Sequence, residues 1–191
     1  MFTIWFLAPT NVVNYTRTLT LAADGLLVAF GGDAGLAACR VLPPIGQWKR
    51  SAGPMVITKV AFDGTSKHLA TLDSTWRVRV WAAESGRLLA RLEAKGTGFA
   101  DNAGLAFSPS GRRLACACYS GRTDVWDWSS GQLIGSWSLQ GSGNVPRVTF
   151  RDEDEVLLLR HERGGAPEAP WKIRTYRLLP GREPEVFSEV T

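Results

Sequence analysis

The chain has 191 residues, which is long enough for one domain with a substantial buried core. Hydrophobic residues make up 45% of it and charged residues 21%, and this balance excludes a disordered polypeptide. The net charge of +4 comes from basic residues that are dispersed along the chain, which disfavours nucleic-acid binding because that function needs a clustered basic stripe.

Short strands and tight turns are predicted along the whole chain, because good helix-forming runs are scarce and 20 glycines punctuate it. Residues 2–7, FTIWFL, predict an extra strand within an N-terminal segment, 1–14. Four similar units follow, at about 15–53, 54–97, 98–142 and 143–191. Residues 1–191 are predicted to form a single domain.

The second and third units define the repeat, because their central parts superimpose without a gap. Phe62 and Phe107 set a period of 45 residues. After each Phe come a Leu, a Trp, a Gly and a large apolar residue at matching distances: Leu69, Trp81, Gly86 and Leu92 in the second unit, and Leu114, Trp126, Gly131 and Trp137 in the third. Short alternating segments and polar turns separate these anchors, so each unit is predicted to form four antiparallel strands in chain order.

The first and fourth units fit the same template more loosely. Their anchors are Leu21, Leu27 and Cys39 in the first unit, and Phe150, Leu157 and Tyr176 in the fourth. In the fourth unit an insertion at 162–170 delays the aromatic anchor, and its Gly and Pro residues predict a projecting loop. Such a loop is more typical of a tolerated spacer than of a peptide contact, although loops on rigid scaffolds often carry function.

One segment carries a family resemblance. Residues 124–137, DVWDWSSGQLIGSW, resemble the strand, Trp-Asp, turn, Gly and strand signature of the WD repeat through Trp126, Asp127 and Gly131. Residues 107–117 resemble the turn and strand that precede it. The resemblance covers nearly all of the chain and implies an all-β fold, a β-propeller of four-stranded antiparallel blades with four blades per chain.

The chain also departs from the family pattern. Neither His68 nor His161 lies where the Gly-His pair is expected, and Thr75 and Ser120 replace the Asp of the turn between the second and third strands. Only Asp33 falls at that turn position. The buried His–Ser–Asp–Trp network of the family is therefore not assumed, and the blades are expected to be held mainly by apolar packing. The aromatic residues expected between the sheets are Trp76, Trp81, Trp126, Trp128 and Trp137.

Four blades raise the question of how the ring closes, because the resemblance implies closed rings of usually six to eight blades. Either four blades close as a small ring, or two chains complete an eight-bladed ring as a homodimer. The homodimer is favoured, with the strand at 2–7 latching onto an outer strand predicted at 185–190. A heteromeric partner would also complete a ring, and a fragment of a longer propeller would likewise contain only four blades.

The three cysteines are too few for a disulfide scaffold. Cys116 and Cys118 lie on one face of a strand by its period of two, and with Cys39 they are interpreted as reduced thiols. A zinc site is disfavoured because it needs about four ligands. Reduced thiols favour the cytoplasm, and no stretch approaches the roughly 20 apolar residues of a transmembrane helix.

The remaining motifs predict no chemistry. The acidic run 152–155 lacks the alternating ligands and the central Gly of a calcium loop, so it is interpreted as a solvated cluster in a turn. The Gly-rich stretches 31–35 and 141–143 are interpreted as turns, because neither precedes a helix as a phosphate loop does. His68 and His161 lie in no nucleophile motif. No catalytic, cofactor-binding or metal residue is assigned.

The sequence thus predicts a non-catalytic scaffold that binds a protein or peptide in the cytoplasm, without a cofactor and as a homodimer. This prediction rests partly on fold-level analogy. The alternative is a self-assembling structural propeller half with no dedicated ligand. An enzyme, a nucleic-acid-binding domain and a membrane-bound protein are all disfavoured.

Overall fold

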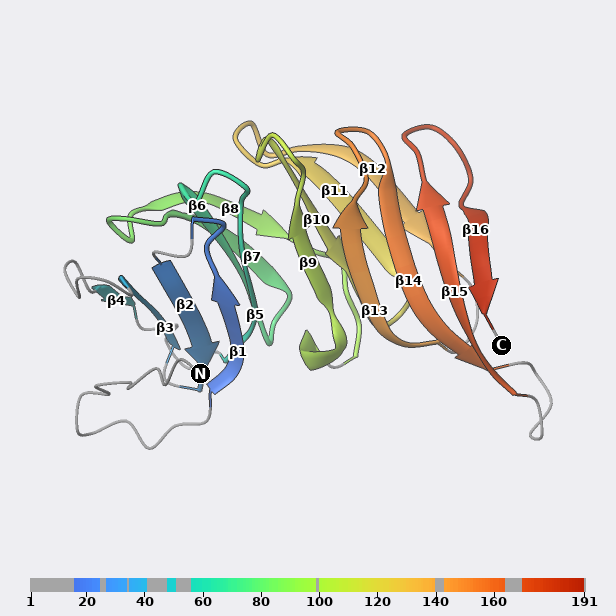
Figure 1. The fold of residues 1–191 in the computed structure, drawn as a ribbon, viewed down its shortest axis with the longest axis horizontal. Coiled ribbons are helices and arrows are strands. Elements are labelled where there is room, and N and C mark those ends of the chain that lie inside the picture. The colour runs from blue at the N-terminus through green and yellow to red at the C-terminus, as the bar shows by residue number, and fades with distance from the viewer. Residues whose placement is uncertain are drawn as a thin grey trace.

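The fold is all-β, as the repeat predicts (Figure 1). The computed structural model describes residues 16–24, 27–33, 35–40, 48–50, 56–98, 100–139, 143–163 and 170–190. Within these ranges the chain forms four antiparallel sheets of four strands each, and every sheet keeps its strands in chain order. The predicted strand at 2–7 lies outside the described residues. No helix in the described part of the chain has the length and apolar character needed to cross a membrane.

The first two sheets come from the N-terminal half of the chain. The first contains β1 (Thr16–Leu21), β2 (Leu27–Gly32), β3 (Gly35–Arg40) and β4 (Trp48–Arg50). The second contains β5 (Ile57–Phe62), β6 (His68–Asp73), β7 (Arg77–Ala82) and β8 (Leu88–Glu93). In β7, Val78 and Val80 are buried while Arg77 is exposed, which is the alternation that a packed antiparallel strand requires.

The other two sheets follow after η1 (Ala100–Asn102), a single 3-10 turn. The third contains β9 (Gly104–Phe107), β10 (Arg113–Ala117), β11 (Arg122–Asp127) and β12 (Gln132–Ser138). The fourth contains β13 (Gly143–Phe150), β14 (Val156–Arg163), β15 (Trp171–Leu178) and β16 (Glu185–Val190).

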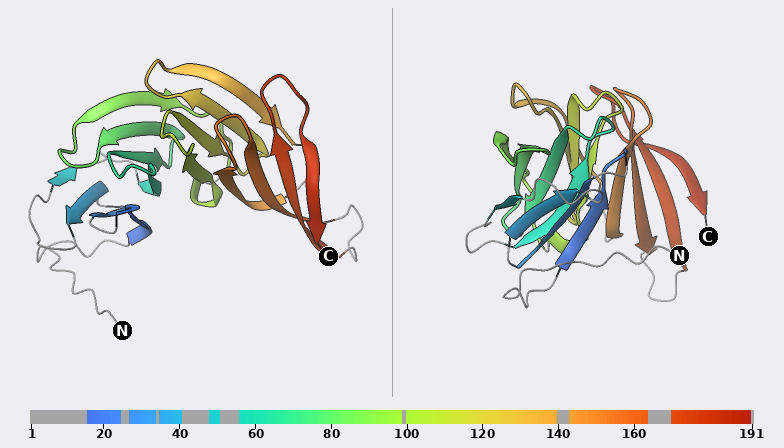
Figure 2. Two further views of the ribbon diagram at one scale, coloured as in Figure 1. Left: turned by 45° about the horizontal axis from the view of Figure 1, so that its top comes forward. Right: turned by 60° about the vertical axis from the view of Figure 1, so that its left-hand side comes forward.

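The four sheets are arranged as propeller blades in an open arc (Figure 2). The first strand of each sheet lies innermost, since β1 contacts β5, β5 contacts β9, and β9 contacts β13. The first and fourth sheets lie at the two ends of the arc. The described residues therefore do not close a four-bladed ring, which was one of the two arrangements considered from the sequence.

Three apolar cores fill the junctions between neighbouring sheets. The first junction is tight, because a Cβ added at Gly31 would lie 2.8 Å from Cβ of Ile57. It buries Ala29, Leu36, Ala38, Ile57 and Leu69. The second junction buries Ala70, Leu72, Val78, Val80, Leu114, Cys116 and Trp126. The third buries Ala115, Ala117, Val125, Trp137, Val148, Val156, Leu158 and Leu178.

The predicted tryptophans do lie between the sheets. Trp76 and Trp126 are buried in the second junction and Trp137 in the third. Trp81 packs against the first core, and Trp128 packs against the second. This part of the prediction from the sequence is confirmed.

Strand pairing corrects two predicted anchors. Phe62 pairs with Leu69 and Phe107 pairs with Leu114, as expected. In the end sheets, however, Leu21 pairs with Val28 and Phe150 pairs with Val156, so Leu27 and Leu157 are not the anchors. The neighbouring residues are equally apolar, and only the pairing register decides which one faces the adjacent sheet.

Two predicted loops begin or end differently from expectation. The insertion was expected at 162–170, but β14 continues to Arg163, and β15 begins at Trp171. The two strands pair without interruption from Val156↔Leu178 to Arg163↔Trp171, so the hairpin is longer than in the other sheets. The Gly-rich stretch 31–35 is also not wholly a turn, because Gly31 and Gly32 end β2.

Candidate functional site

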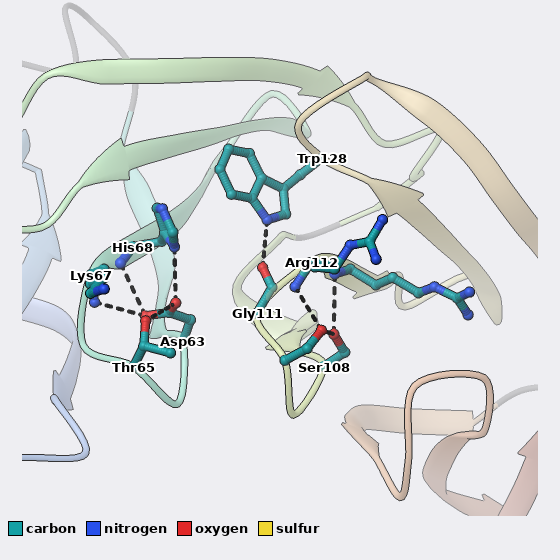
Figure 3. A network of polar contacts seen from close by, with 10 residues as sticks. Asp63, Thr65, Lys67, His68, Ser108, Gly111, Arg112 and Trp128 are labelled. Carbon is teal, nitrogen blue, oxygen red and sulfur yellow. Dashed lines mark hydrogen bonds and ion pairs between the residues drawn. The ribbon is translucent and has the colours of Figure 1, made fainter.

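Four turns at the same end of their sheets follow the arc and form a polar surface. We call this set of turns the turn chain. Its members join β1 to β2, β5 to β6, β9 to β10, and β13 to β14. Figure 3 shows its middle part. In the β5–β6 turn, Asp63 Oδ1 accepts hydrogen bonds from the backbone N–H groups of Lys67 (2.9 Å) and His68 (3.0 Å). Its Oδ2 accepts one from the Thr65 hydroxyl (2.6 Å) and lies 2.9 Å from His68 Nδ1.

The Asp63 carboxylate stays ionised because of these bonds. Its side chain is buried, and this burial, the largest single influence, would raise its pKa. Hydrogen bonds from Thr65 and His68 together outweigh burial and lower the pKa below its ordinary value of 3.8. The turn is therefore organised around a buried negative charge that has partners on every side.

The next turn, between β9 and β10, lies directly against Asp63. A Cβ added at Gly111 would lie 2.8 Å from Asp63 Oδ2, so these two turns are in close contact. The Trp128 indole N–H donates to the Gly111 carbonyl oxygen at 2.7 Å, and the Trp128 ring lies 4.8 Å from the His68 ring (Figure 3). His68 thus contacts residues of two sheets, a position that its place before a predicted strand did not reveal.

The acidic run forms the last member of the turn chain. Glu153 accepts hydrogen bonds from the backbone N–H (2.6 Å) and hydroxyl (2.8 Å) of Ser110. Arg113 donates to the Glu153 carbonyl oxygen at 2.6 Å and forms an ion pair with Asp154. The run was interpreted as a solvated cluster, but part of it joins the fourth sheet to the third.

Similar contacts therefore recur at each step along the turn chain. At the first step the backbone N–H of Asp24 donates to the Ser66 hydroxyl at 3.2 Å. At the second step Gly111 contacts Asp63, and at the third Ser110 contacts Glu153. The turn chain fixes how each sheet sits on the next, and the Asp63–His68 pair is part of this structural role.

At the opposite ends of the strands, two further carboxylates are buried that the sequence did not single out. Asp73 accepts bonds from the backbone N–H groups of Thr75 (2.9 Å) and Arg77 (3.1 Å), and from the Arg79 guanidinium (2.7 Å). Burial by itself would raise the pKa of Asp73, but the Thr75, Arg79 and Arg77 bonds together lower it below 3.8. The Asp-x-Thr spacing of an Asx turn was the available signal.

Asp124 joins the second and third sheets at this side. Its carboxylate accepts hydrogen bonds from the Ser136 hydroxyl (2.7 Å), the Arg122 guanidinium (2.9 Å) and the backbone N–H of Lys95 (3.3 Å). Lys95 follows β8 of the second sheet, so this bond crosses the junction. Buried carboxylates therefore add to the apolar packing that fills the junctions between the blades.

Cys116 and Cys118 share one face of β10 and its extension, as the period of two predicts. Both are free thiols in the second junction, while Ala115 and Ala117 face the third. The hydrogen bond with Cys118 and then burial raise the pKa of Cys116, so its thiol stays protonated. Among the described residues, no three His, Cys, Asp or Glu side chains gather as metal ligands would.

Other residues considered from the sequence lie apart from one another. His161 is exposed on β14 in the fourth sheet, while His68 is in the second. The third cysteine, Cys39, lies on β3, and Asp33 lies between β2 and β3. Gly143 begins β13, and the two residues before it lie outside the described ranges.

The fourth sheet exposes several apolar side chains on its outer face, which points away from the third sheet. Ile173 pairs with Val190, and Trp171 lies on the same side of β15. These three side chains are exposed, as is Phe187 (47%), whose ring lies beneath the guanidinium groups of Arg151 (5.7 Å) and Arg177 (5.0 Å). Apolar clusters of this kind commonly mark an interface.

On its own outer face the first sheet exposes two apolar side chains, while Val28 on the same face is buried. Leu19 and Leu21 are each 55% exposed on β1. Their pairing places them on the side of the sheet opposite to Ala29, which is buried against the second sheet. Both ends of the arc thus expose apolar side chains.

The fold matches that of known structures. A solved structure described as KlHsv2 with loop 6CD replaced by a Gly-Ser linker superimposes with a TM-score of 0.67 and 15% sequence identity. The match covers 91% of this chain and 58% of that one. The fold is that of a β-propeller. No protein-family model and no curated protein matches the chain.

The structural match carries no functional assignment. As many as 1206 solved chains match, and at 15% identity the likeness shows the fold alone. This chain spans 58% of the length of the KlHsv2 structure, so it corresponds to part of that propeller. A function must be argued from the surfaces of the chain itself.

Proposed function

We propose that the chain is a non-catalytic scaffold that binds a protein or peptide through propeller blades of the WD type. The observation that carries this proposal is the apolar outer face of the fourth sheet, with Trp171, Ile173, Phe187 and Val190 exposed together. Aromatic and aliphatic side chains on a rigid sheet are suitable anchors for a partner, because they lose little conformational entropy on binding.

The WD type is supported by the turns between the third and fourth strands. In the third sheet Asp127 Oδ1 accepts bonds from the Ser129 hydroxyl (2.7 Å) and the Ser130 N–H (3.2 Å), and Gly131 closes the turn with φ 75°. Gly86 has φ 65° at the matching turn of the second sheet. The Trp81 indole also donates to the Thr71 hydroxyl at 3.0 Å, a Trp-to-hydroxyl contact like one link of the family's network.

A non-catalytic role is supported by the structural contacts of the Asp63–His68 acid–base pair. Asp63 and His68 could be taken for two members of a catalytic triad. Two hydroxyls of the same turn have structural partners, because the Thr65 hydroxyl donates to Asp63 itself and the Ser66 hydroxyl accepts a hydrogen bond from the Asp24 N–H. The buried free thiols Cys116 and Cys118 support the cytoplasm as the proposed compartment.

A second candidate function is self-assembly without a dedicated ligand. The exposed Leu19 and Leu21 at the opposite end of the arc favour it, because they give the chain a second apolar surface. In this role the fourth sheet would serve only to join copies of the chain.

Quantitative affinity capture tests the scaffold. The wild-type chain and Ile173→Glu are each used as bait in a lysate of the source cells, and the captured proteins other than the bait are compared by mass spectrometry. The matched control is Leu133→Glu, which places the same charge at an exposed leucine of the third sheet. We expect that some proteins are captured by the wild type and by the control but not by Ile173→Glu. Identical sets of captured proteins for all three baits would contradict the proposal.

A further inference from the structure

We draw no further inference here: the strongest candidate, the apolar side chains exposed on the outer face of the fourth sheet and on its edge strand β16, belongs to the surface on which the proposed scaffold already rests, and nothing in the structure shows what covers it.

Discussion

Two regions of the molecule have the same strand pairing but different surroundings. One is the junction between the second and third sheets, and the other is the outer face of the fourth sheet. In the junction, Leu72 and Val78 pair across β6 and β7 and are fully buried. On the outer face, Leu159 and Thr175 pair at the same positions and are only partly buried. The comparison shows that the repeat specifies a sheet with two apolar sides, and that the neighbouring sheet decides whether a side becomes core or surface.

Polar groups differ between the two regions in the same way. Asp124 crosses the junction to the Lys95 N–H, whereas on the outer face Arg177 and Glu155 form an ion pair within a single sheet. In the junction the buried Asp124 carboxylate therefore connects two blades. On the outer face the charges are satisfied locally, so the face is able to accept a partner without first losing a bond.

The largest expected effect compares Leu72 with Leu159. We expect Leu72→Ala to lower the free energy of unfolding by about 3 kcal/mol, because it opens a cavity in a filled junction. Leu159→Ala should cost less than about 1 kcal/mol, because Leu159 is only partly buried and no sheet of the described residues covers it. Urea denaturation in a Leu21→Glu background measures both without a contribution from self-association. Equal losses at the two positions would contradict the assignment of one face as core and the other as surface.

The next largest expected effect compares the buried carboxylate of Asp73 with the exposed carboxylate of Asp152. Asp73→Ala should cost about 2 kcal/mol, because the Thr75 and Arg77 N–H groups and the Arg79 guanidinium lose their acceptor. Asp152 is the matched control, since it accepts similar N–H bonds from Asp154 and Glu155 on an exposed turn. Asp152→Ala should cost clearly less in the same denaturation experiment. A larger loss for Asp152 than for Asp73 would be inconsistent with the role given to burial.

Acid should weaken the blades through Asp63 and Asp73. The pKa of each is lowered in the folded state, so below the ordinary value of 3.8 the unfolded chain binds more protons than the folded one. Their stabilisation is complete above that value and is lost as pH falls through the lowered pKa values. The free energy of unfolding of the wild type should therefore fall below pH 3.8, and the Asp63→Asn, Asp73→Asn double variant should fall less steeply. Parallel curves for the two proteins would exclude these carboxylates as the cause.

The smallest expected effect is at Gly131. Its φ of 75° is unfavourable for a side chain, and no atom lies within 4 Å of a Cβ added there. Gly131→Ala should therefore cost about 1 kcal/mol from backbone strain alone. Ser129→Ala in the same turn loses one exposed hydrogen bond, to Asp127, and should cost less. If Gly131→Ala is neutral, the turn does not require the left-handed conformation.

Much of the fold could be predicted from the sequence because the repeat is strong in its middle. The Phe, Leu, Trp and Gly anchors of the second and third units gave the strands and turns, since each anchor has a distinct structural role. The end sheets were less certain, because Leu27 beside Val28 and Leu157 beside Val156 are equally apolar. Only the pairing, which depends on atoms far apart in the sequence, selects between them.

The polar contacts between blades were the part that sequence patterns could not give. Asp63 and Glu153 lie in turns, where an acidic side chain is usually exposed, and their burial or pairing depends on turns about 45 residues away. The predicted start of the insertion between β14 and β15 is wrong for a related reason. Glu162 looked like part of a loop, but it accepts hydrogen bonds from the Tyr176 hydroxyl (2.8 Å) and from Arg174 (3.1 Å) across the paired strands.

The central claim is that the neighbouring sheet decides whether an apolar side of a sheet becomes core or surface. Thiol labelling of the folded chain tests it most directly, using Leu72→Cys and Leu159→Cys variants in a Cys39→Ala background. Cys116 and Cys118 are buried and should not react. The account predicts fast labelling at position 159, which is only partly buried, and slow labelling at position 72, which is fully buried. Equal labelling rates at the two positions would contradict it.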